Sequence, residues 1–522
     1  MEKGTIFRLA KPKRKGILPI LFSRFLLIVL LLLVQVALIV GVYGWLYEYV
    51  SIFSAFLGVF TLMMILYLFN CEMDATAKLT WLFMIALFPL PTACFLSFTQ
   101  TNAGHVKIKK RVEELIDSAK DSIAQSEDVI CQVKEDGSGV AALTTYLNRS
   151  GCFPLFDHTE ATYFPLGEDK FAAMLEELRK AETYIFMEYF IIEEGYMWGK
   201  ILEVLAEKAK AGVDVRVMYD GMCEVALLPA DYPKRLAKLG IKAKAFSPIL
   251  PIVSSHYNYR DHRKILVIDG KVAFNGGVNL ADEYINHVEK FGHWKDTAVM
   301  LKGEAAKSFT LMFLQMWNID EKAPDFAPYP EDKSFCPEQA GGYVMPFGDC
   351  PLDEDKVGEA VYMDILNRAN DYVHIMTPYL ILDGELASAL KYAAQRGVDV
   401  KLILPGIPDK KAAYALAKSH YQELVNAGVK IYEYTPGFVH AKVFVSDDSK
   451  AVVGTINLDY RSLYHHFECG TFLYQTACIA EIEKDFQDTL AKCRQVTQES
   501  IKKEKMSYKL MGGFLKFFAP LM

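Results

Sequence analysis

Apolar residues are concentrated in the first hundred positions of the chain, in three runs without a charged side chain. The runs cover residues 25–43, 51–69 and 79–98, and each is long enough to cross a bilayer as a helix. A basic stretch at residues 11–15 precedes the first run and favours a cytoplasmic N-terminus. Because two more apolar runs follow the first, a cleaved signal peptide is disfavoured. The pattern therefore predicts a membrane-anchoring region with two or three hydrophobic helices.

The number of crossings stays open, and with it the face of the membrane that carries the rest of the chain. Three full crossings place the remainder outside the cytoplasm, whereas the basic residues between 107 and 111 favour the inside. Pro89 and Pro91 stand in the middle of the third run, where proline removes a backbone donor and kinks a helix. A kinked or re-entrant third segment would return the remainder to the cytoplasm.

Beyond the apolar region, helical and strand-like periodicities alternate. Phe171, Met174, Leu175 and Leu178 recur at helical spacing, and the apolar run that begins at Tyr184 reads as a strand. The expected order is a helix at 169–182, a strand at 184–192, a helix at 199–210 and a strand at 213–219, then again a helix at 357–370, a strand at 373–382, a helix at 385–395 and a strand at 398–404. Strands alternating with helices predict an α/β fold with helices on both faces of each sheet.

The same order of elements appears twice because this part of the chain is duplicated. GVDVRVMYDG begins at Gly212, and GVDVKLILPG begins at Gly397. A stretch rich in Pro, Gly and acidic residues separates the two copies and reads as a linker. We expect a membrane-anchoring region at 1–100, a connecting segment at 101–160, a first domain at 161–321, a linker at 322–355, a second domain at 356–496 and an amphipathic C-terminal tail at 497–522.

Composition narrows the classes of function. The net charge of −7 over 522 residues argues against a broad nucleic-acid-binding surface, so no nucleic-acid partner is expected. The ten cysteines show no CxxC pair and no zinc-type spacing with histidine, which indicates packed free thiols rather than disulfides or a metal centre. The oligomeric state is left open.

One short motif occurs in both copies. The first copy, HRKILVID, contains His262, Lys264 and Asp269. A glycine lies seven residues after Asp269, and Asn279 lies three residues after that glycine. The second copy has the same spacing and consists of His440, Lys442, Asp447, a glycine and Asn457. A lone HxK is common by chance, but two copies with the same extension inside a wider repeat favour a shared active centre built from two half-sites.

The residue types suit displacement at phosphorus. Strand side chains alternate, so His262 and Lys264 share a face, whereas Asp269 falls on an odd step at the strand end and should fix the turn. Two lysines offset the charge of a phosphodiester, and Asn279 and Asn457 can donate to its oxygens. One histidine can attack phosphorus while the other gives its proton to the leaving alkoxide, and no metal or cofactor is needed. His256, His287, His293, His465 and His466 lack repeat partners and are read as packing or surface residues.

The two motifs resemble the HxK(x)4D(x)6G(x)2N mark of the phospholipase D superfamily, and both copies match it. MEYFIIEEGYMWGKIL, YRDHRKILVIDGKVAFNGGVNLADEYI and GTINLDYRSLYHHFECG resemble the bacterial cardiolipin synthases within it. The resemblance implies two phospholipase D-like domains with pseudo-twofold symmetry and one active site between them. It also implies that two phosphatidylglycerols give cardiolipin and glycerol, with His262 forming the phosphatidyl-enzyme and His440 acting as acid and then base. It further implies a multi-pass protein of the bacterial cell membrane, and carboxylates at Asp296 and Glu468 that orient the histidines.

Alternatives remain at this level. A membrane-bound phospholipase D that uses water as acceptor needs the same motif, and phosphatidylserine synthesis is a further variant. Nuclease action is disfavoured by the apolar region and the negative charge, and a non-catalytic scaffold by the intact residues of both motifs. The tail from Lys509, with its Leu, Phe and Met, fits either the bilayer interface or a helix docked on the protein.

Overall fold

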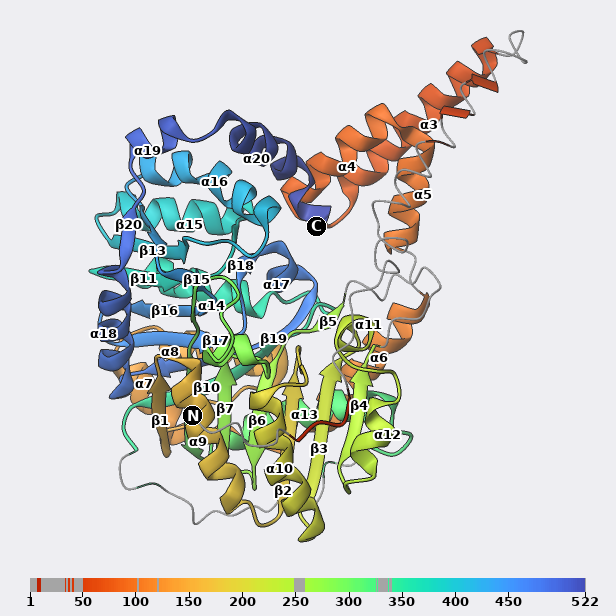
Figure 1. Cartoon of the computed structure of the whole chain (residues 1–522). Coiled ribbons are helices and arrows are strands. Elements are labelled where there is room, and N and C mark those ends of the chain that lie inside the picture. Colours follow the sequence, from red (N-terminus) through yellow and green to blue (C-terminus); the bar gives the residue numbers. More distant parts are fainter. Residues whose placement is uncertain are drawn as a thin grey trace.

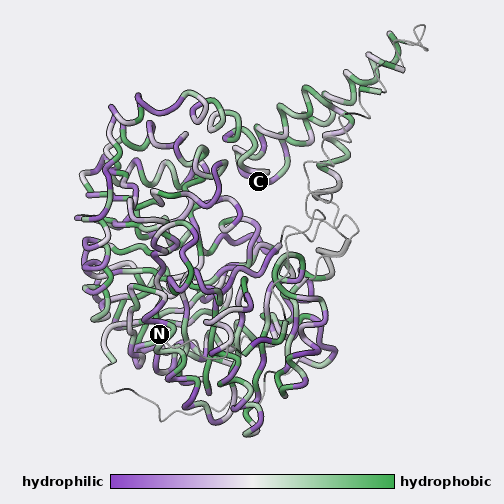
Figure 2. Tube along the Cα trace, viewed as in Figure 1, coloured by the Kyte–Doolittle hydropathy of each residue, from purple (hydrophilic) through white to green (hydrophobic). Residues whose placement is uncertain are grey.

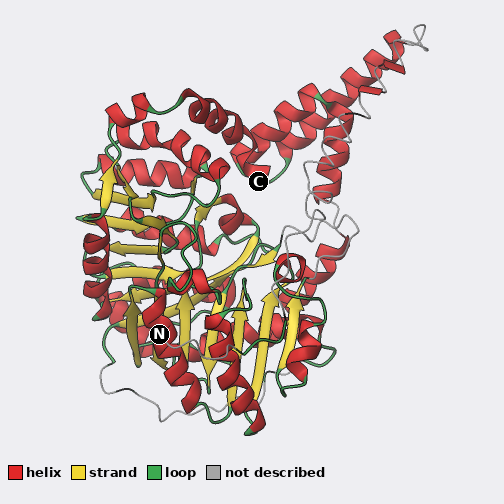
Figure 3. Cartoon of the chain, in the orientation of Figure 1, coloured by secondary structure: helices red, strands yellow, loops and turns green. Residues whose placement is uncertain are grey.

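A computed structural model shows two α/β halves and a helical arm that extends away from them (Figure 1). The structure describes residues 7–10, 33, 36, 37, 40, 41, 50–100, 103–119, 122–247, 259–324, 326, 337 and 340–521. Within these ranges, both halves show strands sandwiched between helices, as the alternating pattern predicts (Figure 3).

The first sheet has the strand order β1-β9-β7-β6-β2-β3-β4. Its strands β2, β3 and β4 are parallel, as expected for strands joined by the crossover helix α10, while β6, β7, β9 and β1 continue the sheet as antiparallel neighbours. The bounds are β1 Thr159–Phe164, β2 Tyr184–Tyr189, β3 Asp214–Asp220, β4 Lys242–Phe246, β6 Lys264–Ile268, β7 Val272–Gly276 and β9 Ala298–Gly303. The helices of this half are α9 Gly167–Lys180, α10 Tyr196–Lys210, α11 Met222–Ala226, α12 Tyr232–Ala237, α13 Ala306–Trp317, and the short η3 Asp282–Ile285 and η4 Asn318–Asp320.

The second sheet repeats this plan in the order β10-β19-β17-β16-β11-β13-β14-β20. Its strands are β10 Tyr343–Asp349, β11 Tyr372–Met376, β13 Asp399–Pro405, β14 Lys430–Tyr434, β16 Val443–Ser446, β17 Lys450–Gly454, β19 His466–Tyr474 and β20 Cys493–Gln495. The helices are α14 Val357–Arg368, α15 Gly384–Gln395, α16 Lys411–Asn426, α17 Tyr460–Tyr464, α18 Cys478–Leu490, α19 Gln498–Lys503, α20 Met506–Phe518 and η5 Ala519–Leu521. The eight helices and strands expected from periodicity all lie close to their expected positions.

Part of the expected linker belongs to the second sheet. Residues 343–349 form β10, which pairs with β19 antiparallel just as β1 pairs with β9 in the first half. The Pro and Gly content of the stretch 322–355 concealed this strand. The expected connecting segment 101–160 is also structured and contains α6 Ala103–Ala119, α7 Glu127–Glu135 and α8 Val140–Gly151.

Two small strand pairs join the halves. β5 (Arg260–Asp261), immediately before the first HxK motif, pairs in parallel with β19 of the second half. β15 (Gly437–Val439), immediately before the second motif, pairs in parallel with β8 (His293–Lys295) of the first half. The exchange is reciprocal, so each motif begins against a strand of the other half. A third small pair, β12 (Leu380–Ile381) with β18 (Leu458–Asp459), lies within the second half.

The helical arm carries the apolar N-terminal region. α3 (Val50–Asn70) corresponds to the second apolar run and is mostly exposed, and Figure 2 shows the arm to be largely hydrophobic. Within the described part of the chain it is the one helix long and apolar enough to cross a membrane by length and composition. Most of the first run, 25–43, lies outside the described residues. The third run is broken into α4 (Ala75–Leu87) and α5 (Pro89–Gln100), which is the expected effect of Pro89.

The C-terminal helix α20 docks on the protein by one face. Gly512 lies against the backbone of α16, and the ring of Phe517 packs edge-on against Phe83 of α4. Met506, Leu510 and Phe514 point outward from the opposite face at helical spacing and are exposed. The tail is therefore a docked helix that also presents an apolar stripe next to the arm.

Candidate active site

The strand exchange between the halves brings the two motif histidines to one place. The backbone N–H of His262 donates to the carbonyl of Phe467, at 2.9 Å, and that of His440 donates to the carbonyl of Lys295, at 2.7 Å. Phe467 and Lys295 each directly precede one of the two expected carboxylates. Each histidine is thus fixed against the chain segment that supplies the acid of the other half.

The acids pair with the histidines across the halves. Nδ1 of His262 lies 2.9 and 3.0 Å from the two carboxylate oxygens of Glu468, and Nδ1 of His440 lies 2.7 Å from Oδ2 of Asp296. Both histidines are about 93% buried, being 7% exposed, and both carboxylates are fully buried. A carboxylate at Nδ1 holds the imidazole proton there, which leaves the lone pair of Nε2 for chemistry.

Burial and charge set the protonation of these groups. Burial, followed by the charges of Lys264 and Lys442, holds the pKa of His262 well below its usual range. Burial and Lys442 lower the pKa of His440 to about 4. Burial alone would raise the pKa of Asp296, but His440 and Lys442 outweigh it and the pKa is lowered. Both imidazoles are therefore neutral, and Asp296 is ionised, in the ligand-free protein at neutral pH.

The two motif lysines lie beside the histidines, with their ammonium groups donating to the carbonyls of His262 and His440 respectively. Lys264 is fully buried and Lys442 is 1% exposed. Burial lowers the pKa of Lys264 to about 8 and that of Lys442 to about 7. A buried anion such as a phosphodiester would offset this desolvation and favour the charged form of both lysines.

The two motif asparagines differ in their contacts. Asn279 accepts from the N–H of Ile191 at 3.1 Å and donates to the hydroxyl of Tyr284 at 2.8 Å, which leaves one of its two amide hydrogens for a ligand. Asn457 is 5% exposed, and its Oδ1 has no hydrogen-bond partner. The two half-sites are therefore alike in their histidine, lysine and acid, but not in their amides.

The motif aspartates lie at the far ends of their strands. Asp269 accepts from the backbone N–H groups of Glu182, Thr183 and Tyr184 at 2.7–2.8 Å, and Asp447 accepts from the same three positions of its half, residues 370–372, at 2.8–3.0 Å. Both aspartates have positive φ, 53° and 51°. The length of β6, about 17 Å for five residues, separates Asp269 from the histidine end. These contacts agree with the expectation from strand parity that the aspartates hold turns.

Replacing Asp269 by alanine is expected to cost stability rather than chemistry. Three N–H groups lose an acceptor that is partly exposed, so we expect a loss of about 2 kcal/mol and a melting temperature lower by about 4–8 °C in detergent. The turnover of the folded fraction stays unchanged. Asp269→Asn keeps an acceptor and tolerates positive φ, so its loss is smaller. A melting temperature equal to wild type with a turnover reduced more than about tenfold would instead place Asp269 in the chemistry.

Three further side chains reach the centre without having been expected. Thr455 donates to Oε2 of Glu468. Two residues before each acid stand Trp294 and His466; the ring of Trp294 is 5.5 Å from that of His440, and the ring of His466 is 5.4 Å from that of His262. His466 is 8% exposed, so it is a buried residue. Its interpretation from the sequence as a packing or surface residue did not foresee its place beside His262. A signal for both residues was available in the sequence, because Trp294 and His466 occupy equivalent positions of the repeat.

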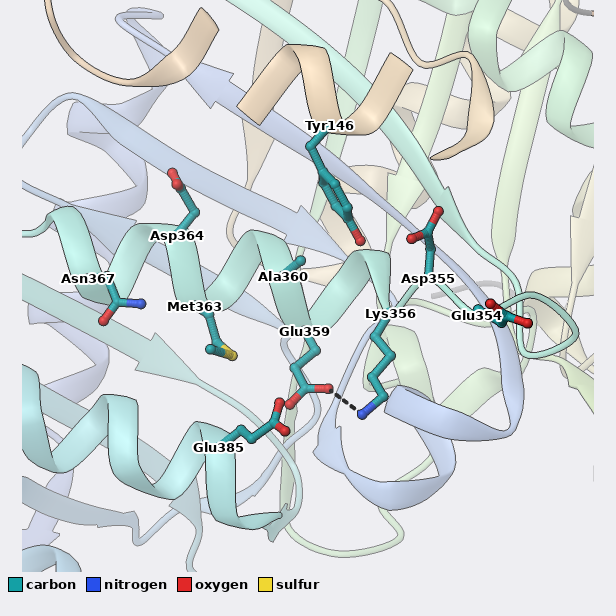
Figure 4. Close-up of a pocket in the computed structure, with 10 residues that line it drawn as sticks. All are labelled: Tyr146, Glu354, Asp355, Lys356, Glu359, Ala360, Met363, Asp364, Asn367 and Glu385. Atoms are coloured by element: carbon teal, nitrogen blue, oxygen red, sulfur yellow. Dashed lines mark ion pairs between the residues drawn. The ribbon is translucent and has the colours of Figure 1, made fainter. Parts of the chain in front are cut away.

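A cavity away from the histidine centre lies in the second half of the chain. It has a volume of about 480 Å³ beside α14, and none of its ten lining residues belongs to the histidine centre (Figure 4). Five of the ten are acidic, and burial together with Asp383 raises the pKa of one of them, Glu359, to about 8. Its negative charge would repel a phosphodiester, so we place the chemistry at the histidines and not in this cavity.

Comparison with known proteins shows the family to which the chain belongs. The family model described as "Cardiolipin synthase, PLD-like domain" matches residues 174–317 and 362–490. A cardiolipin synthase of Halalkalibacterium halodurans is 31% identical over 92% of this chain and 95% of its own length, and cardiolipin synthase 2 of Bacillus anthracis is 33% identical over 85% and 86%. An uncharacterised protein of Streptococcus mutans is 57% identical over 88% of this chain and 99% of its own length.

The fold is also found among solved structures. A phosphatidylserine synthase of Haemophilus influenzae matches with a TM-score of 0.54 over 73% of this chain and 97% of its own. The sequence identity is 16%, so this likeness concerns the fold alone.

Proposed function

Because this chain belongs to the cardiolipin synthases with phospholipase D-like domains, and so is a phosphatidyltransferase, we propose that it joins two phosphatidylglycerols. The products are cardiolipin and glycerol. The proposal is carried by one observation: two buried histidines, each paired at Nδ1 with the acid of the other half, meet beside two buried lysines.

In the first step, Nε2 of His262 attacks the phosphorus of one phosphatidylglycerol. The bond between phosphorus and the glycerol oxygen breaks, and the leaving oxygen takes a proton from protonated His440, so that glycerol departs and a phosphatidyl group remains on His262. Glu468 stabilises the positive charge that develops on the imidazole of His262. The phosphate anion, entering next to His440 and Asp296, favours the protonated form of His440 that this step requires.

In the second step, the roles of His440 reverse. Now neutral, it takes the proton from a hydroxyl of the second phosphatidylglycerol, whose oxygen attacks phosphorus and displaces His262. Cardiolipin forms, the histidine is regenerated, and the reaction is reversible because each step exchanges one phosphodiester or phosphoramidate for another. Lys264 and Lys442 offset the charge on the phosphoryl oxygens, and Asn279 and Asn457 add neutral donors.

The deciding experiment uses the full-length protein in phosphatidylglycerol vesicles, without nucleotide, with lipids separated by chromatography. We expect cardiolipin and glycerol in equal amounts. Phosphatidic acid as the dominant product would mean that water is the acceptor, and the protein would be a phospholipase D. A requirement for CDP-diacylglycerol would exclude the two-step mechanism.

A lipid substrate requires the centre to lie close to a membrane. We propose that the protein is an integral protein of the bacterial cell membrane, anchored by α3 and by further apolar segments of the first hundred residues. Labelling of single cysteines introduced into the two α/β halves, from each side of sealed vesicles, gives the face that carries them. Labelling of a cysteine between the apolar runs separates two crossings from three.

Lys442 is expected to set the upper limit of the pH range. The pKa of its ammonium is lowered to about 7 by burial and by Lys264, while Asp296 and Glu468 act in the opposite direction. As the pH rises through this value the ligand-free centre loses positive charge, so kcat/KM for phosphatidylglycerol falls above about pH 7–8. Arginine stays charged, so in Lys442→Arg the fall of kcat/KM should begin at a higher pH or disappear. This holds even if the variant has a lower maximum rate. The same decline in wild type and variant would show that another group titrates.

A further inference from the structure

Three buried side chains at the centre have the composition of a transition-metal site. His262, His466 and Glu468 each offer one ligand atom, and these atoms lie within 4.8 Å of one another. The three residues are 7%, 8% and 0% exposed. His466 and Glu468 stand two positions apart in β19, but His262 comes from the other half of the chain, so no sequence spacing could reveal the group.

The distances suit a tetrahedral ion. From Oε1 of Glu468, Nδ1 of His262 lies at 2.9 Å and Nδ1 of His466 at 3.7 Å. Ligand atoms around zinc, bound at 2.0–2.2 Å in a tetrahedron, stand about 3.3 Å apart. The two observed distances lie within about 0.4 Å of this value. All three ligand atoms lie within 4.8 Å of one another, so the side chains would need to draw together around the ion.

His466 has a reason to accept a ligand. Neither of its ring nitrogens makes a hydrogen bond, although the side chain is buried. An unpaired buried polar group is unfavourable, and a ligand that pairs with it recovers that free energy. The equivalent residue of the first half is Trp294, whose ring cannot coordinate a metal, so the group exists on one side of the centre alone.

We propose that His262, His466 and Glu468 bind a divalent transition ion of the zinc type and that the bound ion inhibits phosphatidyl transfer. Two imidazoles and one carboxylate are a common donor set for zinc, whereas magnesium and calcium prefer oxygen ligands alone. The ammonium groups of Lys264 and Lys442 oppose a cation here, so the ion binds reversibly rather than as a structural part of the fold.

Inhibition follows from the tautomer of His262. In the free enzyme Nδ1 carries the proton and faces Glu468, and Nε2 carries the lone pair that attacks phosphorus. A metal on Nδ1 takes the lone pair of that nitrogen, so the single proton of the neutral ring moves to Nε2. The number of protons is unchanged, but the nucleophilic lone pair is lost. The inhibition rests on the proposed function, whereas the binding does not.

Binding is tested with Co²⁺, which replaces zinc and gives strong visible absorption in a tetrahedral site. Titration of the full-length protein in detergent should produce this spectrum, and Zn²⁺ should abolish it. His466→Asn should weaken the site roughly 10- to 100-fold or more. The control His465→Asn alters the neighbouring, more exposed histidine and should keep the spectrum. Wild-type protein without a tetrahedral Co²⁺ spectrum would overturn the proposal, whatever the variants do.

Inhibition is tested in phosphatidylglycerol vesicles. Zn²⁺ should lower the wild-type rate of cardiolipin formation at least about tenfold, Mg²⁺ should leave it unchanged, and EDTA should restore it. Measured against each variant's own metal-free rate, His466→Asn should resist Zn²⁺, and His465→Asn should remain sensitive. Equal inhibition of wild type and His466→Asn at the same Zn²⁺ concentration would place the inhibitory ion elsewhere. If wild type makes no cardiolipin under any condition, the proposed function fails, and the Co²⁺ titration still decides the site.

Discussion

His262→Ala and His440→Ala are each expected to abolish cardiolipin formation, with rates lower by about 10⁵-fold or more. The expectation follows from the shared centre, because one histidine supplies the bond to phosphorus and the other moves the proton in both steps. Neither can take over both roles, since each is held by its own acid at Nδ1. The measurement is the initial rate in phosphatidylglycerol vesicles, at equal amounts of folded protein.

The chain offers a matched control for these variants. His374 is also buried, and its Nδ1 also pairs with an acid, Glu483, at 2.9–3.0 Å, but it lies on β11 outside the centre. His374→Ala should lose stability and keep its turnover per folded molecule. Substantial turnover by His262→Ala or His440→Ala would contradict a centre that needs both histidines.

Asp296→Asn and Glu468→Gln are expected to lower kcat by about 10³- to 10⁴-fold and to leave KM nearly unchanged. An amide can turn its N–H toward Nδ1, and the imidazole then carries its proton on Nε2, where it can neither attack phosphorus nor accept a proton. The amide also fails to stabilise the imidazolium. Since each acid serves the histidine of the other half, the Asp296 variant should impair the proton transfers of His440, and the Glu468 variant the attack by His262.

Glu483→Gln makes the same chemical change at the His374 pair and should leave kcat unaffected. The two active-site variants can be separated by trapping the enzyme after acid quench. In Asp296→Asn, the phosphatidyl-histidine that forms should persist, because His440 is then a poor base for the second step. In Glu468→Gln, much less phosphatidyl-histidine should form, because the attack by His262 is impaired. A kcat within about tenfold of wild type in either variant would show that the acids do not govern the tautomer.

Features that depend on near neighbours in the chain could be predicted from the sequence. The spacing of His262 and Lys264 puts both on one face of a strand end, and the odd step to Asp269 assigns that residue to the turn, where three backbone N–H groups meet it. Helical periodicity located α9 and α14 because it reflects a buried face that each helix must have. β10 was missed because an edge strand in a Pro- and Gly-containing stretch carries little periodicity.

The sequence by itself identified the repeated histidine and lysine of each half of a duplicated α/β chain, and the family resemblance added one acid in each half. Only the tertiary structure decided which acid serves which histidine, since those contacts join residues 206 and 144 positions apart. It also brought His466 next to His262 and left its nitrogens unpaired. The physical reason is that motif spacing reflects local backbone geometry, whereas the crossed pairs depend on how β5 and β15 add to strands of the opposite half.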